Sequence, residues 1–310
     1  MGDMARLPLV SIIIPAYNHA GYLSEAIDSV LGQDYPNVEL IVLDDGSTDN
    51  TAEVLRGYGD AFRWETHKNM GQASTLNKGW AIAKGEVLAY LSADDVLQPN
   101  AVSSIVPFLQ GDIVMAYCDF NLIDPASQPI RRVEAPDFDY VAMVRDFVCQ
   151  PGPGAFMTRS AYEQVGGWDV TLRQLPDLEY WMRLGLVGRF VRVPKVLAGF
   201  RVHEESQTFS AASIDRAEEP LRVVQSIFDD PRFFDQLRSL KGHALSNAWL
   251  LAAQLHLRAG RIVLGLRALK QSAFVFPKNI LTSRFFRVIA NAIANKFFHR
   301  FLRRLRSAAG

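Results

Sequence analysis

Two adjacent carboxylates, Asp94 and Asp95, are the residues whose types and spacing most directly suggest chemistry. They follow an apolar run, Val87–Leu91, that predicts a buried strand, and Pro99 suits the start of the next helix. Because open α/β sheets bind ligands at the carboxyl ends of their strands, we expect both acids at such an edge. A divalent cation between two like charges would relieve their repulsion and bind phosphate oxygens. The alternative is a strand-ending turn with two solvated acids.

Two earlier apolar runs end in polar clusters in the same way. The first, Val10–Ile14, leads into Pro15–Asn18, and the second, Leu40–Leu43, leads into Asp44–Asp49. Each cluster precedes a stretch in which apolar residues have helical spacing. This repetition is typical of βαβ units, and it predicts a parallel sheet with its ligand edge on one side.

The chain of 310 residues is long enough for one large domain with an appendage. Its two cysteines, Cys118 and Cys149, give no disulfide framework, and we expect both to be reduced core residues. The first eight residues contain no apolar signal-peptide core. No uninterrupted run of about 18 apolar residues is present, so we expect no membrane-spanning helix.

Charge is distributed unevenly along the chain. Residues 241–310 carry 13 Lys and Arg and no Asp or Glu, so the first 240 residues hold 20 of the 33 basic residues and all 33 acidic ones. A net charge of zero therefore describes neither part. Such an asymmetry predicts either an anionic partner for the C-terminal part or its docking onto the acidic body.

The pattern of the chain changes at about residue 213. Residues 8–118 alternate between predicted strands and helices and would form a nucleotide-binding half. Residues 119–175 are more irregular, with many prolines and glycines, and such loops often carry a second substrate. Residues 119–213 would therefore form an acceptor-side half. We predict an α/β domain over 1–213, with a mostly parallel sheet flanked by helices, and an all-helical region over 214–310.

Shorter elements follow from local spacing. Residues 176–187 predict a helix, and 189–193 and 196–202 predict two short strands. Ala244–Leu257 and Arg261–Phe274 resemble a helical hairpin.

The tail, residues 279–306, has an apolar residue at every fourth position from Leu281 to Leu305, with basic residues between. On a straight helix of 3.6 residues per turn this stripe drifts by about 40° per step, so we expect two short amphipathic helices or a bend near Asn295. The functional interpretation is a helix lying on an anionic membrane surface. The alternative is a helix packed on the body with solvated arginines.

Seven segments stand in a fixed order along the chain: Ile14–Asn18, Asp44–Asp49, Asn69–Gly71 with Asn77–Gly79, Ser92–Asp95, Gly166–Asp169, Asp177–Leu184, and Arg201–His203 with Ser206 and Gln207. Together they resemble family 2 glycosyltransferases of the GT-A fold over roughly residues 8–210. Each segment alone is a weak signal, and the loop Asp44–Asp49 is the strongest. Seven in the right order are hard to obtain by chance.

The resemblance implies a nucleotide site made by Pro15, Tyr17, Asp45, Asn77 and Asp94. An aromatic ring can stack on a base, and a carboxylate can accept a hydrogen bond from a base N–H or a ribose hydroxyl. The alternative is that Tyr17 merely shapes a turn and Asp45 caps the next helix.

The resemblance also implies a metal site, in which Asp95 and His203 bind Mn²⁺ or Mg²⁺ bridging the diphosphate, with Asp94 reaching the ribose or the metal. An imidazole ligand favours Mn²⁺ over Mg²⁺ somewhat. A lone histidine such as His203 could instead be a surface or hydrogen-bonded residue.

Asp177 would be the general base for an acceptor hydroxyl, and direct displacement would invert the anomeric centre. Its alternative role is that of an acid favoured by the helix dipole. Two positions depart from the family pattern, because Ser92 and Pro176 stand where an acid is often found. The acceptor should bind near Gly154.

The motif Gly166–Asp169 supplies three further residues of the expected acceptor and donor-sugar region, namely Gly167, Trp168 and Asp169. The sequence therefore predicts an inverting, metal-dependent transferase. It would move a sugar from a nucleoside diphosphate donor, uridine-linked by preference, to a hydroxyl of a glycan or lipid-linked acceptor in cell-surface polysaccharide synthesis. We expect a cytoplasmic protein, peripheral on the inner face of the cell membrane, and no nucleic-acid partner.

Two rival functions stay open. A nucleotidyltransferase also uses paired acids and a metal, but it normally needs a basic phosphate loop near the first strand, and Pro15–Gly21 contains no Lys or Arg. A non-catalytic, membrane-associated nucleotide-sugar-binding protein would keep its biological activity after Asp177→Asn. Dehydrogenase and P-loop functions are excluded because neither glycine motif is present.

Overall fold

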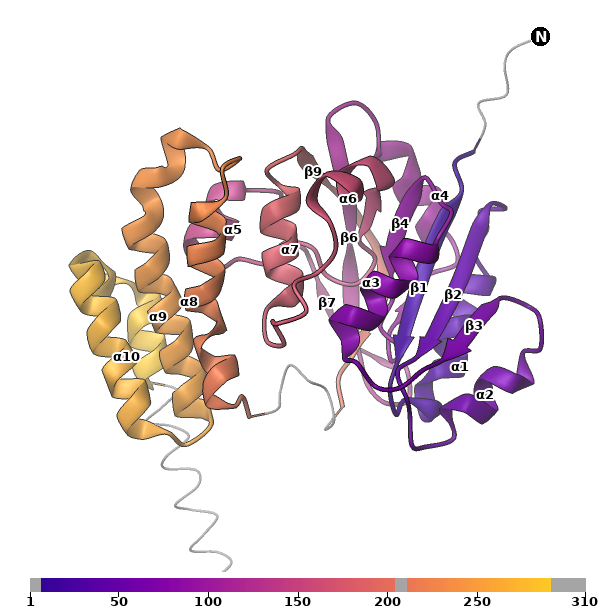
Figure 1. The fold of residues 1–310 in the computed structure, drawn as a ribbon, viewed down its shortest axis with the longest axis horizontal. Coiled ribbons are helices and arrows are strands. Elements are labelled where there is room, and N and C mark those ends of the chain that lie inside the picture. The colour runs from indigo at the N-terminus through magenta and orange to yellow at the C-terminus, as the bar shows by residue number, and fades with distance from the viewer. Residues whose placement is uncertain (1–6, 204–210, 291–310) are drawn as a thin grey trace, which may run out of the picture. The chain divides into compact units, whose positions relative to one another are not determined.

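The computed structural model describes residues 7–203 and 211–290, which belong to two compact units (Figure 1). Among these residues, the first unit comprises 7–139, 149–171 and 176–203, and the second comprises 140–148, 172–175 and 211–290. Two short segments of the predicted acceptor-side half thus cluster with the C-terminal helices.

A nine-stranded sheet forms the centre of the first unit. Four of its strands, in the order β3-β2-β1-β4, are parallel to one another, as the sequence predicted. These strands are β1 (Val10–Ala16), β2 (Val38–Asp44), β3 (Arg63–Thr66) and β4 (Val87–Tyr90). Ala16 pairs with Asp44 at the carboxyl ends of β1 and β2, and Ile13 pairs with Tyr90. The polar segments that follow β1, β2 and β4 therefore leave the sheet at one edge.

The other half of the sheet is mixed and continues from β4 in the order β8-β6-β9-β5, with β7 paired to β6. Its strands are β5 (Val96–Leu97), β6 (Ile113–Ile123), β7 (Pro129–Val133), β8 (Phe156–Thr158) and β9 (Arg189–Arg201). The prediction of two short strands near residue 194 was wrong, because β9 is one strand of 13 residues. Pro194 lies where the register with β6 shifts, and a proline without an N–H is accommodated at such an irregularity.

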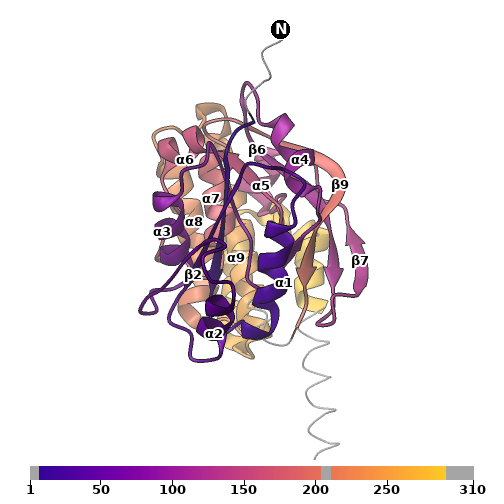
Figure 2. The same cartoon turned by 90° about the vertical axis from the view of Figure 1, so that its right-hand side faces the viewer.

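Helices cover both faces of the parallel strands (Figure 2). Ile12 and Ile14 share an apolar cluster with Leu23 of α1, whereas Ile13 lies against Gly79 of α3. Because successive side chains of a strand point to opposite faces, α1 and α3 lie on opposite sides of the sheet. The helices of this unit are α1 (Ala20–Leu31), α2 (Thr51–Gly57), α3 (Gln72–Ile82), α4 (Ala101–Ile105), η1 (Val106–Phe108), α6 (Arg159–Val165) and α7 (Pro176–Leu184).

The described part of the second unit is helical beyond residue 214, as predicted. Its elements are α5 (Tyr140–Asp146), α8 (Ile214–Asp229), η3 (Asp235–Leu240), α9 (Lys241–Arg258), α10 (Ile262–Val275) and η4 (Pro277–Leu281). The pair α9 and α10 is the predicted hairpin, and Leu250 and Leu257 of α9 pack against Leu269 of α10 in its core. Residues 283–290 are also helical, and the bend expected near Asn295 lies outside the described residues.

None of the helices in the described part of the chain is long and apolar enough to cross a bilayer. The cysteines differ in their surroundings. Cys118 of β6 is buried, as predicted, but Cys149 is exposed, because it lies in an irregular segment between α5 and β8 rather than in a strand. Both thiols are free.

Candidate functional site

The two acids that the sequence singled out lie in the turn between β4 and β5, and their side chains have different partners. The Asp95 carboxylate is buried and accepts a hydrogen bond from the backbone N–H of Arg201 at 2.9 Å. Burial and the neighbouring charge of Asp94 raise the pKa of Asp95 well above its ordinary value. Asp94 is half-buried, and its Oδ2 lies 3.0 Å from Nε2 of His203. Asp94 is thus the acid that faces the histidine.

A second histidine completes a cluster around this carboxylate. Nε2 of His19 lies 3.8 Å from Oδ2 of Asp94, and the ligand atoms of His19, Asp94 and His203 all lie within 4.8 Å of one another. Nδ1 of His19 is 2.7 Å from the carbonyl oxygen of Tyr17. A proton on Nδ1 donated to that carbonyl leaves the lone pair of Nε2 directed into the cluster, which is how protein ligands are commonly oriented toward a metal. The donor set fits a divalent transition metal.

This geometry differs from the metal site predicted from sequence. The prediction combined Asp95 with His203, whereas the structure brings Asp94 and His19 to His203 and turns Asp95 toward backbone. Asp94, which the sequence had left between ribose and metal, is therefore the acid of this candidate cluster. His19 was missed, although a signal existed: β1 and β4 are neighbours, so residues just beyond β1 should lie near those just beyond β4.

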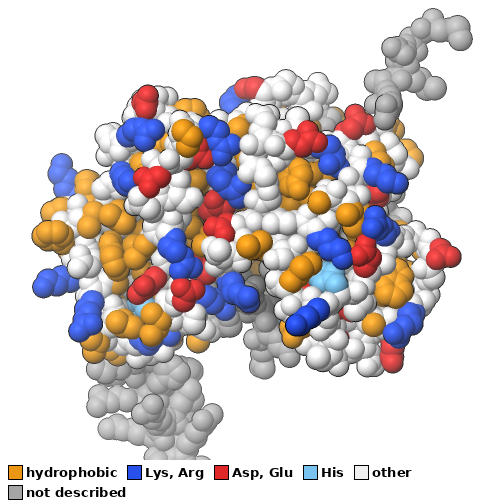
Figure 3. All heavy atoms as spheres, in the orientation of Figure 1, with side chains coloured by type: hydrophobic (Ala, Val, Ile, Leu, Met, Phe, Trp, Pro, Cys, Tyr) orange, Lys and Arg blue, Asp and Glu red, His pale blue; other side chains and the backbone are white. Residues whose placement is uncertain are grey.

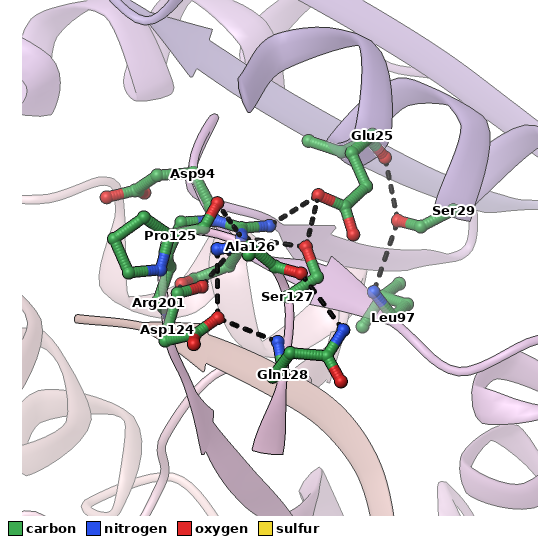
Figure 4. A network of polar contacts seen from close by, with 12 residues as sticks. Glu25, Ser29, Asp94, Leu97, Asp124, Pro125, Ala126, Ser127, Gln128 and Arg201 are labelled. Carbon is green, nitrogen blue, oxygen red and sulfur yellow. Dashed lines mark hydrogen bonds and ion pairs between the residues drawn. The ribbon is translucent and has the colours of Figure 1, made fainter. Parts of the chain in front are cut away.

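Arg201 at the end of β9 holds the Asp94–Asp95 turn in place (Figure 4). Its guanidinium group is fully buried and donates to the carbonyl oxygens of Asp94 at 2.7 Å and Asp124 at 3.0 Å. It also donates to Oγ of Ser127 at 2.8 Å and pairs with the Glu25 carboxylate of α1 at 2.6 Å. One side chain thus joins β9, the acidic turn and α1.

The same arginine supports the histidine cluster through an aromatic ring. The guanidinium carbon of Arg201 lies 4.7 Å from the ring centroid of Tyr22, and the centroid of that ring lies 5.1 Å from that of His203. A cation over a tyrosine face is attracted by the ring quadrupole. The sequence quoted Arg201 only as part of a motif, so its role in positioning the turn was missed.

The predicted nucleotide loops lie together beyond β1 and β2. The backbone N–H of Asn18 donates to Oγ of Ser47, and Oδ1 of Asn18 accepts from the N–H of Thr48. Asn18 has a φ of 55°, a left-handed conformation that asparagine tolerates better than most residues. Pro15 is buried within β1, whereas the Tyr17 side chain beside it is exposed and available for stacking.

Asp45, predicted to bind the nucleotide, also fixes the backbone before α3. Its buried carboxylate accepts hydrogen bonds from the backbone N–H groups of Met70 at 2.6 Å and Gly71 at 2.9 Å, just before α3 begins. Nδ1 of His67 lies 3.6 Å from Oδ1 of Asp45. Each carboxylate oxygen has a second lone pair, so a contact with a base remains chemically open.

Asn77, predicted as a nucleotide contact, holds the segment around Trp168. Its amide donates to the carbonyl oxygen of Trp168 at 2.8 Å and accepts from the N–H of the same residue at 2.8 Å. A Cβ at Gly167 would lie 2.3 Å from Oδ1 of Asn77, so only glycine allows this approach. The ring of Trp168 is buried, with its centroid 5.2 Å from that of Tyr90.

The remaining predicted acceptor residues also shape their loops. Oδ1 of Asp169 accepts from the N–H and the hydroxyl of Thr171, each at 2.8 Å. Gly154 has a φ of 77°, and a Cβ there would lie 2.7 Å from the Sγ atom of Cys118. These contacts explain why the residues occupy their positions.

Asp177, the predicted base, lies in the first turn of α7 and is half-buried. Burial raises the pKa of its carboxyl group, against a smaller lowering by the N–H of Leu178, which donates to Oδ1 at 2.8 Å. Burial also raises the pKa of Tyr90, and the charge of Asp177 adds to that rise, followed by smaller effects that include Asp95.

Glu179 and Arg183 of α7 form an ion pair with each other. Arg183 binds both carboxylate oxygens of Glu179, at 2.7 and 2.8 Å, and donates to the carbonyl oxygens of Val165 and Gly167. This contact ties α7, which carries Asp177, to the loop after α6.

Comparison with known proteins agrees with this fold. The family model described as "Glycosyl transferase family 2" matches residues 11–171, just over half of the chain. An uncharacterized glycosyltransferase of Rickettsia typhi is 36% identical over 214 residues, which are 66% of this chain and 67% of the relative. A hyaluronan synthase of Pasteurella multocida is 28% identical over 228 residues, covering 72% of this chain and 23% of that enzyme.

Solved structures of low sequence identity share the fold. The chain superposes on S. aureus TarS 1–349 in complex with UDP-GlcNAc with a TM-score of 0.65 and 17% identity, covering 93% of this chain and 89% of that one. For the mannosyltransferase PcManGT from Pyrobaculum calidifontis, in complex with GDP-Man and Mn²⁺, the TM-score is 0.58 with 20% identity, and the coverage is 94% and 88%. The chain belongs to glycosyltransferase family 2 and has the GT-A fold, as the order of its motifs predicted.

Proposed function

We propose that this glycosyltransferase moves a sugar from a uridine diphosphate donor to a hydroxyl group of a glycan or lipid-linked acceptor, with inversion and with the help of a divalent metal. The observation that carries the proposal is the cluster of His19, Asp94 and His203 at the sheet edge that also carries the nucleotide loops. The UDP-GlcNAc complex of TarS supports a uridine donor, and the hyaluronan synthase supports a glycan acceptor.

In this proposal the three clustered side chains hold the metal. Carboxylate and imidazole together suit Mn²⁺ better than Mg²⁺, which prefers oxygen ligands and water. The bound cation would supply positive charge that offsets the charge developing on the leaving diphosphate. Arg201 keeps the acidic turn in a fixed position, so little reorganisation would be needed when donor binds.

The proposed nucleotide contacts lie beside this cluster. The exposed ring of Tyr17 would stack on the base, and Asp45 would accept a hydrogen bond from it. Asn77 would act indirectly. Its amide fixes the backbone of Trp168, and the ring of Trp168 packs against that of Tyr90 at the end of β4.

Asp177 would carry out the proton transfer. As the acceptor oxygen forms a bond to the anomeric carbon, the bond from that carbon to the diphosphate oxygen breaks on the opposite face, and the hydroxyl proton passes to the carboxylate. The raised pKa of Asp177 suits this step, because a stronger base takes a proton more readily.

A donor screen followed by NMR of the product tests the proposal. The purified protein is incubated with UDP-, GDP- and dTDP-sugars, Mn²⁺ and oligosaccharide or lipid-linked acceptors, and the anomeric signals are compared with those of the donor. We expect transfer or slow hydrolysis of a uridine donor, with the opposite anomeric configuration in the first product formed. Retention of configuration would overturn the single-displacement mechanism, and turnover of a GDP-sugar alone would overturn the donor class.

A further inference from the structure

The helical unit exposes a set of large apolar side chains that no described element covers. Phe274 is 81% exposed and Leu281 is 78% exposed, the two highest values among the exposed large apolar residues of the described part of the chain. The set lies on α10, on η4 and just beyond, and comprises Ile262, Val263, Leu266, Phe274, Ile280, Leu281 and Phe286.

Helix α10 is apolar on both sides. Its inner side, which includes Ala268 and Leu269, packs in the core of the hairpin with α9. Its outer side carries Leu266 and Phe274, eight residues apart and so within about 80° of each other on the helix surface. Lys270 lies between them on the same exposed side. A surface helix of a soluble domain normally places polar residues there.

Basic residues surround these apolar side chains, and acids are absent from the elements concerned. Arg267 and Lys270 are exposed on α10, Lys278 is exposed on η4, and Arg287 is exposed beyond it. The sequences of α9, α10 and η4 contain no Asp or Glu, and α9 and η4 are the elements against which α10 mainly packs. Figure 3 shows apolar side chains gathered over the region of these helices, with Lys and Arg side chains at its outer margin.

We propose that the outer side of α10, together with η4, binds the surface of an anionic lipid bilayer. Projecting residues such as Phe274 and Leu281 can enter the boundary between headgroups and acyl chains. Lysines and arginines around them can pair with anionic headgroups over a continuous surface, which needs no matching pocket. The sequence placed a membrane contact in residues 279–306, and this proposal places one on described elements. It is independent of the donor and of the catalytic mechanism.

Vesicle sedimentation of the full chain tests the proposal. The probes are vesicles of phosphatidylcholine alone and of phosphatidylcholine mixed with phosphatidylglycerol. We expect the wild type to bind the mixed vesicles roughly tenfold or more tightly than the neutral ones, and to be released by salt. Phe274→Asp combined with Leu281→Asp should lower this binding by about tenfold or more, and Arg267→Glu with Lys270→Glu should act in the same direction.

A matched control is Ile130→Asp on β7, which is 57% exposed and belongs to the other unit. It should bind vesicles as the wild type does, and circular dichroism should show all variants folded. Equal binding to both vesicle types, or equal loss in the control, overturns the proposal. So does a wild-type dimer in light scattering that Phe274→Asp dissociates, because a second copy would then cover the surface. Loss of binding only when arginines beyond residue 290 are replaced would assign the contact to the tail instead.

Discussion

At the scale of single residues, the site depends on which atoms face the acidic turn. Asp94 and Asp95 are neighbours in sequence, yet one carboxylate faces two histidines and the other accepts from a backbone N–H. Residue types and spacing were sufficient to predict that this pair of acids belongs to a binding site. They could not predict which member faces outward, because that depends on the distant strand β9 and its Arg201.

Replacing His19 with Gln should weaken Mn²⁺ binding by roughly tenfold or more, because even the loss of a supporting contact to a metal ligand costs about that much. Titration of Mn²⁺ followed by electron paramagnetic resonance measures this without any substrate. His67→Gln is the control, because His67 contacts Asp45 and lies outside the cluster. Unchanged affinity in His19→Gln would leave His19 without a ligand role.

Replacing Asp177 with Asn should lower kcat by about 10² to 10⁴, the usual contribution of a general base, while nucleotide binding stays intact. Stability should not fall at neutral pH. A carboxyl group whose pKa is raised by burial binds its proton more tightly in the folded state, so the folded state loses stability as pH rises through that pKa. Urea unfolding together with initial rates checks both statements, and an active, destabilised variant would contradict them.

The pH dependence of the wild-type rate follows from the same group. Because Asp177 must lose its proton to act as a base, kcat should rise with pH and level off above its pKa. Burial raises that pKa, so the acidic limb should lie above the ordinary range of an aspartate. Initial rates at saturating donor measure the limb. A rate that is already constant at the ordinary aspartate pKa would show that another group controls the proton transfer.

At the scale of elements, apolar runs and polar clusters were sufficient to predict the parallel strands and their common edge. They failed where pairing is non-local. Residues 189–193 and 196–202 were predicted as two strands, but they form one strand, β9, whose register shift accommodates Pro194. The assignment of Asn77 to the nucleotide stays a prediction, but the sequence did not show that its amide also binds a backbone segment 91 residues away. The order of the motifs predicts which loops lie together. It does not predict which side chains form the hydrogen bonds between those loops.

Arg201 offers a test of how these elements are held together. Arg201→Met should destabilise the protein by about 2–4 kcal/mol, because it removes the buried guanidinium group that donates to the carbonyl oxygens of Asp94 and Asp124 and pairs with Glu25. Thermal or urea unfolding measures the change. The exposed pair of Arg63 and Glu65 gives the control, and Arg63→Met should cost less than about 1 kcal/mol. Equal costs would mean that Arg201 does not fix the turn.

At the scale of the whole molecule, the neutral net charge conceals an acidic catalytic part and a basic helical part. This division was visible in the sequence, as was the helical hairpin. The exposed apolar side of α10 was not, because its spacing alone cannot tell which apolar residues face the hairpin core and which face outward. The proposed catalytic site and the proposed membrane surface are separate hypotheses, and each can fail without the other.

Calorimetric titration of UDP, with and without Mn²⁺, into the wild type, Asp94→Asn and Asp95→Asn tests the central claim most directly. The site described above predicts tight binding only for the wild type with Mn²⁺, and a loss of the metal dependence in Asp94→Asn. Asp95→Asn should keep that dependence if it folds, because its carboxylate faces backbone. Metal-independent binding in all three proteins, or binding in none of them, would contradict the assignment of the cluster as the metal and donor site.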